Sequence, residues 1–348
     1  MPSTLRMPAE WEGHECTLLA WPTNKDDWPG KFRPIPWVFC EMIRHLSVGE
    51  RVDLIVPSGC IEEKVRRNLV KARANLDNIH FIHQTLDRGW MRDCSPAFVR
   101  RGDAVEAVHF GFNGWAKYDN YQLDATVPER LSESLGLGRV EALHRGRHIV
   151  LEGGALDGNG GGTLLTTEEC LLHPETQIRN PDFTREDYEV LFRQYLGIEK
   201  VIWLGDGIAG DDTHGHVDDL CRFVNPNTVV LCGESDVNDD NYRALAENRE
   251  RLQGATTARG ESIDVVALPM PAPLYFDDTR LPASYANFYI GDEAVLVPTF
   301  NDVKDRLALG TLAELFPDRR VVGIHAVDLV WGFGTVHCLS HEVPRLNA

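Results

Sequence analysis

The sequence lacks segments that would direct a protein into a membrane or out of the cell. Its first residues, MPSTLRMPAEWEGHE, contain no apolar core flanked by basic residues, so they do not resemble a secretory signal. No apolar stretch in the sequence is long enough to span a bilayer. We therefore expect a cytoplasmic protein that does not bind membranes.

Basic residues are also scarce. The chain of 348 residues has 53 acidic and 35 basic residues and a formal net charge of −18. Proteins that bind nucleic-acid duplexes are usually basic, so this balance argues against a nucleic-acid partner. A negative surface would attract a small cationic molecule, but many cytosolic enzymes are acidic for solubility, and charge alone favours that second interpretation.

The eight cysteines include no CxxC pair, which excludes a metal knuckle or redox motif of that type. Disulfides are not expected in a chain without a secretory signal. Cys40 and Cys232 lie inside apolar runs, as buried small hydrophobic residues do. A reactive thiol must therefore be identified from its local context.

Strand pairs recur along the chain without a low-complexity linker between them. They begin near residues 16, 94, 163, 220, 285 and 337. Helices lie between them; one is capped by Thr184 and runs through Tyr195, with Gly197 just past its end. The recurrence predicts an α/β protein with a single catalytic domain, residues 1–348, of about five ββαβ modules that close on themselves. An ordinary open α/β sheet is the alternative that the pattern leaves.

Four segments carry the residues that could perform chemistry. They are WMRDCSP around Asp93, LEGG around Glu152, the acidic stretch 211–219, and GFGTVHCLSH around Cys338. A cysteine after a glycine-bearing turn, with histidines close by, fits a thiolate nucleophile. The local sequence alone nevertheless favours one more buried cysteine at this position.

The stretch 211–219 is the densest polar cluster. If residues 214–218 are extended, then His214, His216 and Asp218 point to the same face. Two imidazoles and a carboxylate can hold zinc, so a zinc-dependent hydrolase is an alternative. Asp219 stands where the HxHxDH motif of metallo-β-lactamase-fold hydrolases has its last histidine. A solvated acidic loop is the other alternative.

Together, the four segments supply a cysteine, a histidine and several carboxylates. A guanidinium is planar and always charged, and two carboxylates can grip it through paired hydrogen bonds. A thiolate attacks its carbon better than a neutral hydroxyl does, and a histidine can protonate the departing ammonia and then activate water. The combination predicts a cysteine-dependent hydrolase of guanidinium groups.

Six segments in order resemble the agmatine deiminase and bacterial peptidyl-arginine deiminase family. They are MPAEWEGHECTLLAWP, WMRDCSPAFV, EGGALDGNGGGTLLTTEECLL, DDTHGHVDDLCRFV, LPASYANFYI and GFGTVHCLSHEVP. The resemblance covers nearly the whole chain, from about residue 7 to residue 345. The family belongs to the pentein superfamily, so the resemblance implies a five-bladed pseudosymmetric α/β propeller.

The resemblance also implies roles for individual residues. Cys338 corresponds to the nucleophile and His216 to the general acid/base. Asp93 and Asp218 correspond to the pair of carboxylates that grip the guanidinium. Glu152 corresponds to an acid that lines the site beside the histidine.

The implied reaction converts agmatine and water to N-carbamoylputrescine and ammonia through a covalent thiouronium on Cys338. Trp90 resembles an aromatic residue that packs on the substrate. Members of this family need no metal or organic cofactor, and relatives often assemble, so we expect a homodimer. Peptidyl arginine, free arginine or another small guanidine are alternative substrates, and a guanidine-binding protein without turnover is the non-enzyme alternative.

The chain departs from the family's motifs at several positions. Phe333 replaces a glycine in the cysteine loop, where Ser340 and His341 replace other polar residues. RDCSP replaces RDTGP, and His214 replaces an asparagine. None of these changes removes a catalytic group, so they concern what the site accepts beyond the guanidinium.

Overall fold

The computed structural model describes residues 5–345 of the chain. In this part of the molecule, no helix combines the length and the apolar character needed to cross a membrane. Helices and strands alternate along the chain, so the α/β class expected from the sequence is confirmed.

Most strands belong to small sheets that share one topology. Residues 5–345 contain five sheets of three or four strands, and in each an antiparallel pair continues into a parallel neighbour. The strands therefore do not form one continuous open sheet. In sheet order they are β1 (Leu5–Arg6), β5 (Ala97–Arg101), β6 (Ala104–His109) and β7 (Gly138–Glu141); β10 (Asp157–Gly158), β11 (Thr163–Thr167) and β12 (Lys200–Leu204); β13 (Cys221–Asn225), β14 (Thr228–Gly233) and β15 (Asp264–Pro269); β18 (Tyr289–Ile290), β19 (Ala294–Thr299) and β20 (Arg320–His325); and β21 (Ser340–Pro344), β2 (His14–Ala20), β3 (Val52–Val56) and β4 (Ile79–His83). Two separate hairpins are β8 (Leu143–His144) with β9 (Arg147–His148), and β16 (Leu274–Phe276) with β17 (Thr279–Leu281).

Helices make the connections between parallel strands, because a parallel pair cannot be joined by a tight turn. They are α1 (Ile35–Leu46), α2 (Gly59–Ala72), α4 (Val127–Leu135), α5 (Glu168–Leu172), α6 (Arg185–Leu196), α7 (Asn241–Leu252) and α8 (Asp305–Leu315). The helix expected from Thr184 is α6. Thr184 and Asp187 form a reciprocal capping box at its start, and Gly197 ends it with a φ of 70°.

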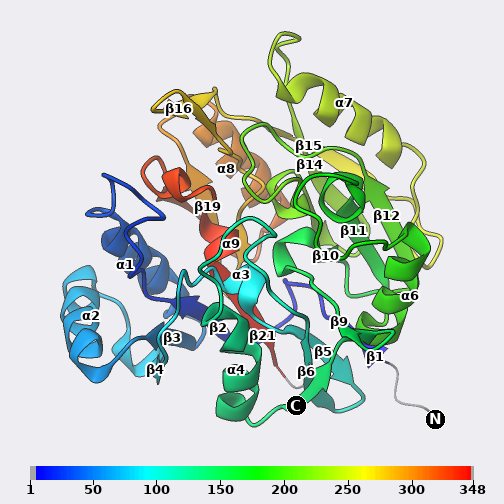
Figure 1. The fold of residues 1–348 in the computed structure, drawn as a ribbon. Coiled ribbons are helices and arrows are strands. Elements are labelled where there is room, and N and C mark those ends of the chain that lie inside the picture. Colours follow the sequence, from blue (N-terminus) through cyan, green and yellow to red (C-terminus); the bar gives the residue numbers. More distant parts are fainter. Residues whose placement is uncertain (1–4, 346–348) are drawn as a thin grey trace.

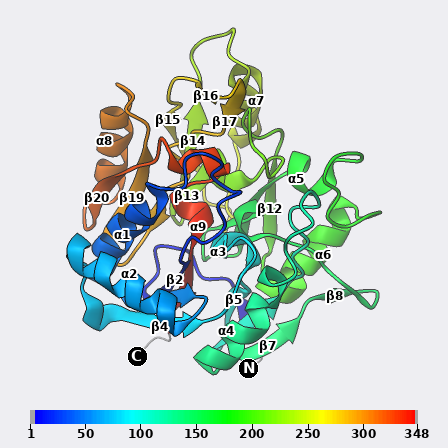
Figure 2. The same ribbon diagram turned by 60° about the vertical axis from the view of Figure 1, so that its left-hand side comes forward.

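Two short helices occupy the middle of the molecule. The helices α3 (Met91–Cys94) and α9 (Val336–Leu339) lie side by side, and the sheets surround them (Figures 1 and 2). The strand expected near residue 94 begins at Ala97, because Met91–Cys94 form α3 first. The longer helices lie toward the outside of the molecule (Figure 1).

The beginning and the end of the chain share one sheet. Strand β21 pairs antiparallel with β2, with Leu18 opposite His341 and Leu19 opposite Ser340. The pairing of β21 with β2 brings α9, directly before β21, into the centre of the fold.

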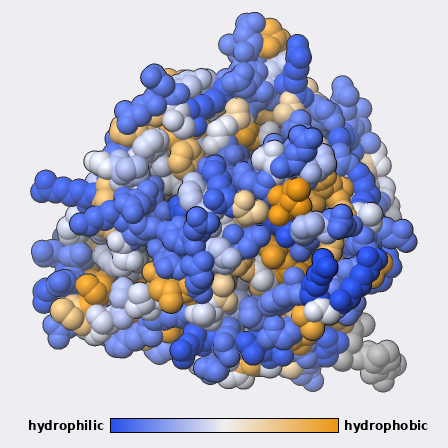
Figure 3. All heavy atoms as spheres, in the orientation of Figure 1, coloured by the Kyte–Doolittle hydropathy of each residue, from blue (hydrophilic) through white to orange (hydrophobic). Residues whose placement is uncertain are grey.

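The face of the molecule seen in Figure 3 is mostly hydrophilic, with apolar side chains in small groups.

Candidate active site

Cys338 lies in α9 and is only 3% exposed. Its Sγ accepts a hydrogen bond from Nδ2 of Asn287 at 3.1 Å and lies 3.7 Å from Oδ2 of Asp218. Oδ1 of Asn287 accepts hydrogen bonds from the Thr335 hydroxyl at 2.7 Å and the His337 backbone N–H at 3.1 Å. A single amide side chain thus contacts the thiol and also fixes the turn that carries it.

His337 connects the site to a buried charge network. Its Nδ1 lies 2.6 Å from Oδ2 of Asp218, and its Nε2 lies 2.7 Å from Oε2 of Glu10. Glu10 also pairs with Arg92 at 3.2 Å and with Arg222 at 3.0 Å. Burial alone would raise the pKa of Asp218, but the hydrogen bond and charge of His337 lower it. Asp218 is therefore held as a carboxylate beside the thiol.

Asp93, in α3, is the second carboxylate of the site. Its Oδ2 accepts a hydrogen bond from Nε1 of Trp115, and its Oδ1 accepts one from the backbone N–H of Gly154, both at 2.9 Å. Burial raises the pKa of Asp93, although the charge of His216 opposes this effect. A cation bound beside Asp93 would favour its ionised form.

His216 is completely buried between two carboxylates. Its Nδ1 lies 3.8 Å from Oδ1 of Asp93, and its Nε2 lies 3.9 Å from Oε2 of Glu152. Neither ring nitrogen has a hydrogen-bond partner within residues 5–345. Burial alone would lower the pKa of His216, but the charge of Asp93 and the nearby Cys170 and Glu152 raise it well above its usual value. The ring is thus poised as an imidazolium that can donate a proton.

Arg179 keeps Glu152 ionised. Its Nε donates to Oε1 of Glu152 at 3.1 Å, and both side chains are fully buried. Burial alone would raise the pKa of Glu152, but the charge of Arg179 lowers it to about 2. Arg179 also donates to the carbonyl of Thr213 at 2.6 Å. Arg179 therefore connects the loop before His216 to Glu152, the acid beside that histidine.

Gly154 allows these groups to come together. A Cβ at this position would lie 2.4 Å from Nδ1 of His216 and 2.9 Å from Oδ1 of Asp93. Any side chain here would push the imidazole away from the carboxylate. A glycine at position 154 therefore lets the backbone come close to His216 and Asp93.

The thiol of Cys338 is protonated in this environment. Burial raises its pKa well above the usual value, and the charges of Asp218, Asp219 and Asp93 add to the effect. The hydrogen bond from Asn287 acts in the opposite direction. A cation placed between the carboxylates would offset their charge and favour the thiolate.

A pocket opens onto the thiol. Asp93 and Cys338 belong to its lining, together with Arg88, Trp90, Trp115, Tyr118, Asp212, Thr213, Gly332, Phe333 and Gly334. Trp90 packs its ring 5.5 Å from that of Trp28 and donates to Asp27, so its position in the wall is fixed. A lining that combines aromatic side chains with carboxylates suits a planar cation.

The predicted zinc arrangement is wrong for His214. This residue has a φ of 63° and Gly215 has a φ of 90°, and a turn of 3₁₀ helix follows at Val217–Asp219. Side chains consequently do not alternate as they would in an extended segment. Nδ1 of His214 lies 3.2 Å from Glu169, and no metal-ligand cluster within the described residues joins His214 to His216 and Asp218.

His341 also lies outside the pocket of the thiol. Its ring is 5.5 Å from that of Phe98, in a second pocket shared with Arg92 and Glu342. Burial lowers the pKa of His341 to about 3, so it is neutral. The structure therefore brings together Cys338, His216, Asp93, Asp218, Glu152 and Trp90, the residues proposed from the sequence, but not His214 or His341.

Several residues of this site were not identified from the sequence. Asn287 stands in the apolar run SYANFYI, where a buried amide is itself a signal. His337 directly precedes Cys338. Glu10, Trp115 and Arg179 carry no comparable local signal, because only the tertiary fold brings them to the site.

Comparisons with known proteins agree with this geometry. Residues 6–344 match the family described as Porphyromonas-type peptidyl-arginine deiminase. An agmatine deiminase of Ectopseudomonas mendocina is 33% identical, with 97% of this chain and 95% of that protein covered. A structure of the agmatine deiminase of Enterococcus faecalis is 31% identical with a TM-score of 0.88, covering 99% of this chain and 97% of that one. A Cys-to-Ser variant of the C. jejuni agmatine deiminase with substrate bound is 28% identical with a TM-score of 0.86, covering 98% and 96%.

Proposed function

The chain belongs to the Porphyromonas-type peptidyl-arginine deiminase family, and we propose on this premise that it is an agmatine deiminase. It hydrolyses a C–N bond of a guanidino group, converting agmatine and water to N-carbamoylputrescine and ammonia. One observation carries the proposal. Cys338 and Asp93 line one pocket, with Asp218 3.7 Å from the thiol and the His216 imidazole 3.8 Å from Asp93, so the carboxylates suit a guanidinium and the thiol suits its carbon.

The first half of the reaction forms a covalent intermediate. Asp93 and Asp218 orient the guanidinium, whose positive charge offsets theirs, so that the thiol of Cys338 releases its proton to solvent and becomes a thiolate. The thiolate attacks the central carbon, and the His216 imidazolium gives its proton to the departing nitrogen. Ammonia leaves, and an S-alkylthiouronium remains on Cys338.

The second half hydrolyses this intermediate. His216 is now neutral and takes a proton from water, which attacks the thiouronium carbon. The bond to sulfur breaks, the proton left on the added oxygen passes to the sulfur, and a ureido product leaves, which restores the thiol and the imidazolium. Glu152, fixed by Arg179, stabilises the imidazolium at each stage. Trp90 forms part of the wall against which the guanidinium lies.

The pocket wall offers two charged residues to the far end of a substrate. Asp212 accepts a hydrogen bond from the Tyr118 hydroxyl at 2.6 Å and pairs with Lys117. Arg88 pairs with Asp27 at 2.5 Å and lies 3.8 Å over the Tyr118 ring. Asp212 favours the amine of agmatine. Arg88 favours a carboxylate, which makes free or C-terminal peptidyl arginine the second candidate.

Ammonia release from agmatine, arginine and an arginyl peptide tests both candidates. We expect the highest kcat/KM for agmatine, and Asp212→Asn to lower it for agmatine more than for arginine. The matched variant Arg88→Gln should affect arginine more than agmatine. A protein inactive on every guanidine would refute the deiminase function, whereas a preference for arginine would refute only the choice of substrate.

We further propose that the five sheets within residues 5–345 are the blades of one pseudosymmetric propeller, and that residues 1–348 form a single catalytic domain. The recurring antiparallel pair with a helical crossover supports this arrangement. We also propose a cytoplasmic homodimer that needs no cofactor. Sedimentation at several concentrations tests the dimer, and activity after exhaustive dialysis against a chelator tests the independence from metal.

A further inference from the structure

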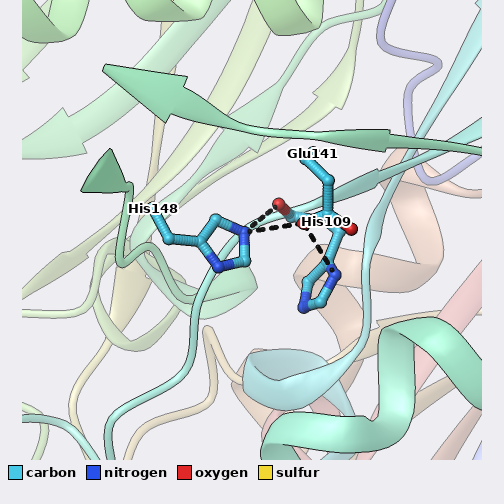
Figure 4. A group of neighbouring side chains, drawn as sticks. All are labelled: His109, Glu141 and His148. Atoms are coloured by element: carbon cyan, nitrogen blue, oxygen red, sulfur yellow. Dashed lines mark hydrogen bonds and ion pairs between the residues drawn. The ribbon is translucent and has the colours of Figure 1, made fainter. Parts of the chain in front are cut away.

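Away from the catalytic pocket, three potential metal ligands meet where three strands end. His109 ends β6, Glu141 ends β7 and His148 ends β9. His109 and Glu141 are direct partners in the parallel pairing of β6 with β7. Figure 4 shows the carboxylate of Glu141 between the two imidazole rings.

The spacing of the donor atoms matches that of a coordination sphere. Oε2 of Glu141 lies 3.3 Å from Nδ1 of His109 and 3.3 Å from Nε2 of His148. A tetrahedral Zn²⁺ with bonds of about 2.1 Å places its ligand atoms roughly 3.4 Å apart. One ligand atom from each of the three residues lies within 4.8 Å of the others. An ion can therefore bind with little movement of the side chains.

The surroundings of the His109 ring also suit a metal. Nδ1 of His109 is shielded from solvent and, beside its ion-pair contact with Glu141, has no hydrogen-bond partner within residues 5–345. Nε2 of His148 contacts the carbonyl oxygen of His109 at 2.8 Å. When a metal binds, Nε2 would give up this contact and coordinate the ion instead.

Backbone hydrogen bonds join the segments that carry the three residues. The backbone N–H groups of Ala142 and Gly111 donate to the carbonyls of His109 and Ile149, at 3.0 and 2.7 Å. The side chains of Glu141 and His148 are 42% and 35% exposed. Water can therefore reach the ion and supply the fourth ligand.

We propose that His109, Glu141 and His148 form a binding site for a divalent transition metal, with Zn²⁺ as the preferred ion. Imidazole and carboxylate ligands suit this class of ion. The site is distinct from the catalytic pocket and is formed by different residues. When filled, it fastens the segment around His148, three residues before the LEGG motif, onto the end of β6.

Titration with Co²⁺, followed by absorption spectroscopy, tests the proposal, and Zn²⁺ competition measures the affinity. We expect one equivalent of Co²⁺ with visible d–d bands and without the near-ultraviolet band of a cobalt–thiolate bond. His148→Gln and Glu141→Gln should each abolish this binding. His83→Gln is the matched control, because His83 and Glu62 form a pair, 2.6 Å apart, that belongs to no cluster of three donors within residues 5–345.

A second measurement does not depend on the spectrum. Zn²⁺ should raise the unfolding temperature of the wild-type protein and of His83→Gln, but not that of His148→Gln. Binding that survives in both His148→Gln and Glu141→Gln would overturn the proposal. So would a thiolate band, which would assign the ion to a cysteine such as Cys338, or the absence of binding to the wild-type protein.

Discussion

At the scale of single residues, the site combines a protonated thiol with a protonated imidazole. Burial and the surrounding carboxylates keep the thiol protonated, whereas the imidazole is protonated because its neighbours outweigh the effect of burial. The enzyme at rest is therefore not a thiolate–imidazolium pair of the kind that reacts with any electrophile. A cationic substrate supplies the charge that completes the nucleophile, which gives selectivity for guanidines a direct electrostatic basis.

Replacing the nucleophile should separate binding from turnover. Cys338→Ser should lower kcat on the order of 10⁴-fold or more, since a neutral hydroxyl attacks the delocalised cation poorly. Binding of agmatine, measured by calorimetry, should remain within a few-fold of wild type. Cys60→Ser, at an exposed cysteine, is the control and should be fully active. Unchanged turnover in Cys338→Ser would rule out this residue as the nucleophile.

The amide that contacts the thiol should control its reactivity. Asn287→Asp replaces a donor to Sγ with a second negative charge and should raise the pKa of Cys338 further. The rate of alkylation by iodoacetamide, measured against pH, should therefore have a higher midpoint in the variant. Asn238→Asp, at an exposed position, should leave the midpoint unchanged. A lower midpoint in Asn287→Asp would contradict this role.

The sequence predicted the residues that the structure brings together at the site better than it predicted their surroundings. Motifs carry Cys338, His216 and the acids, so resemblance assigns them one by one. The zinc arrangement failed because it assumed an extended backbone, and the positive φ of His214 reverses the direction of the chain. Arg179 was missed because its partner, Glu152, is 27 residues away in the sequence.

At the scale of elements, the site is assembled from strand ends, short helices and tight turns. Local signals predicted α6, because a capping box and a terminal glycine act within a few residues. The helices α3 and α9, of four residues each, are too short to show a periodic pattern. Tertiary packing holds them in place, so sequence alone did not predict them.

The turn after Glu152 should tolerate no side chain at its second glycine. In Gly154→Ala the new Cβ would displace the His216 ring, so we expect kcat to fall about 10- to 100-fold, as misplacement of a catalytic group does. Gly161→Ala, in the next glycine-rich turn, is the matched control, since its Cβ would meet the nearest atom at an ordinary 3.4 Å. Equal activity of the two variants would contradict the packing argument.

A buried pair beside β2 should make stability depend on pH. Nδ1 of His14 lies 2.8 Å from Oε2 of Glu50. Burial alone would lower the pKa of His14, but Glu50 raises it to about 9. Since the folded state binds this proton more tightly than the unfolded chain, the stabilisation is complete below about pH 6.5 and is lost as the pH rises through about 9.

Unfolding temperatures measured from pH 6 to pH 10 test this dependence. The difference between wild type and His14→Gln should be largest at the acidic end and should shrink as the pH rises. His325→Gln, at an exposed histidine, provides the control. A difference that stays constant with pH would show that His14 contributes by packing alone.

At the scale of the whole molecule, the net charge of −18 is opposite in sign to the charge of the substrate and attracts it. Such a field accelerates the encounter with a cation, and salt screens it over about 10 Å at 0.1 M. We expect kcat/KM for agmatine to fall several-fold as sodium chloride is raised, while kcat stays constant. A kcat/KM that does not change with salt would mean that the charge serves solubility only.

The arrangement of the sheets was the feature of the fold that the sequence predicted least well. Recurring strand pairs indicated repeated modules, but pairing between β2 and β21 joins residues more than 300 positions apart, such as Leu18 and His341. Local propensity contains no information about such a contact. The strand pattern left closed modules and an open sheet as alternatives, and the resemblance to a known family favoured the closed modules.

The pairing of β21 with β2 also makes the site depend on contact between distant parts of the chain. Cys338 stands just before β21, and the partners of β21 in β2 lie more than 300 positions earlier in the sequence. Opening of this strand pair would therefore also release the proposed nucleophile, so activity and the integrity of this sheet should be lost together.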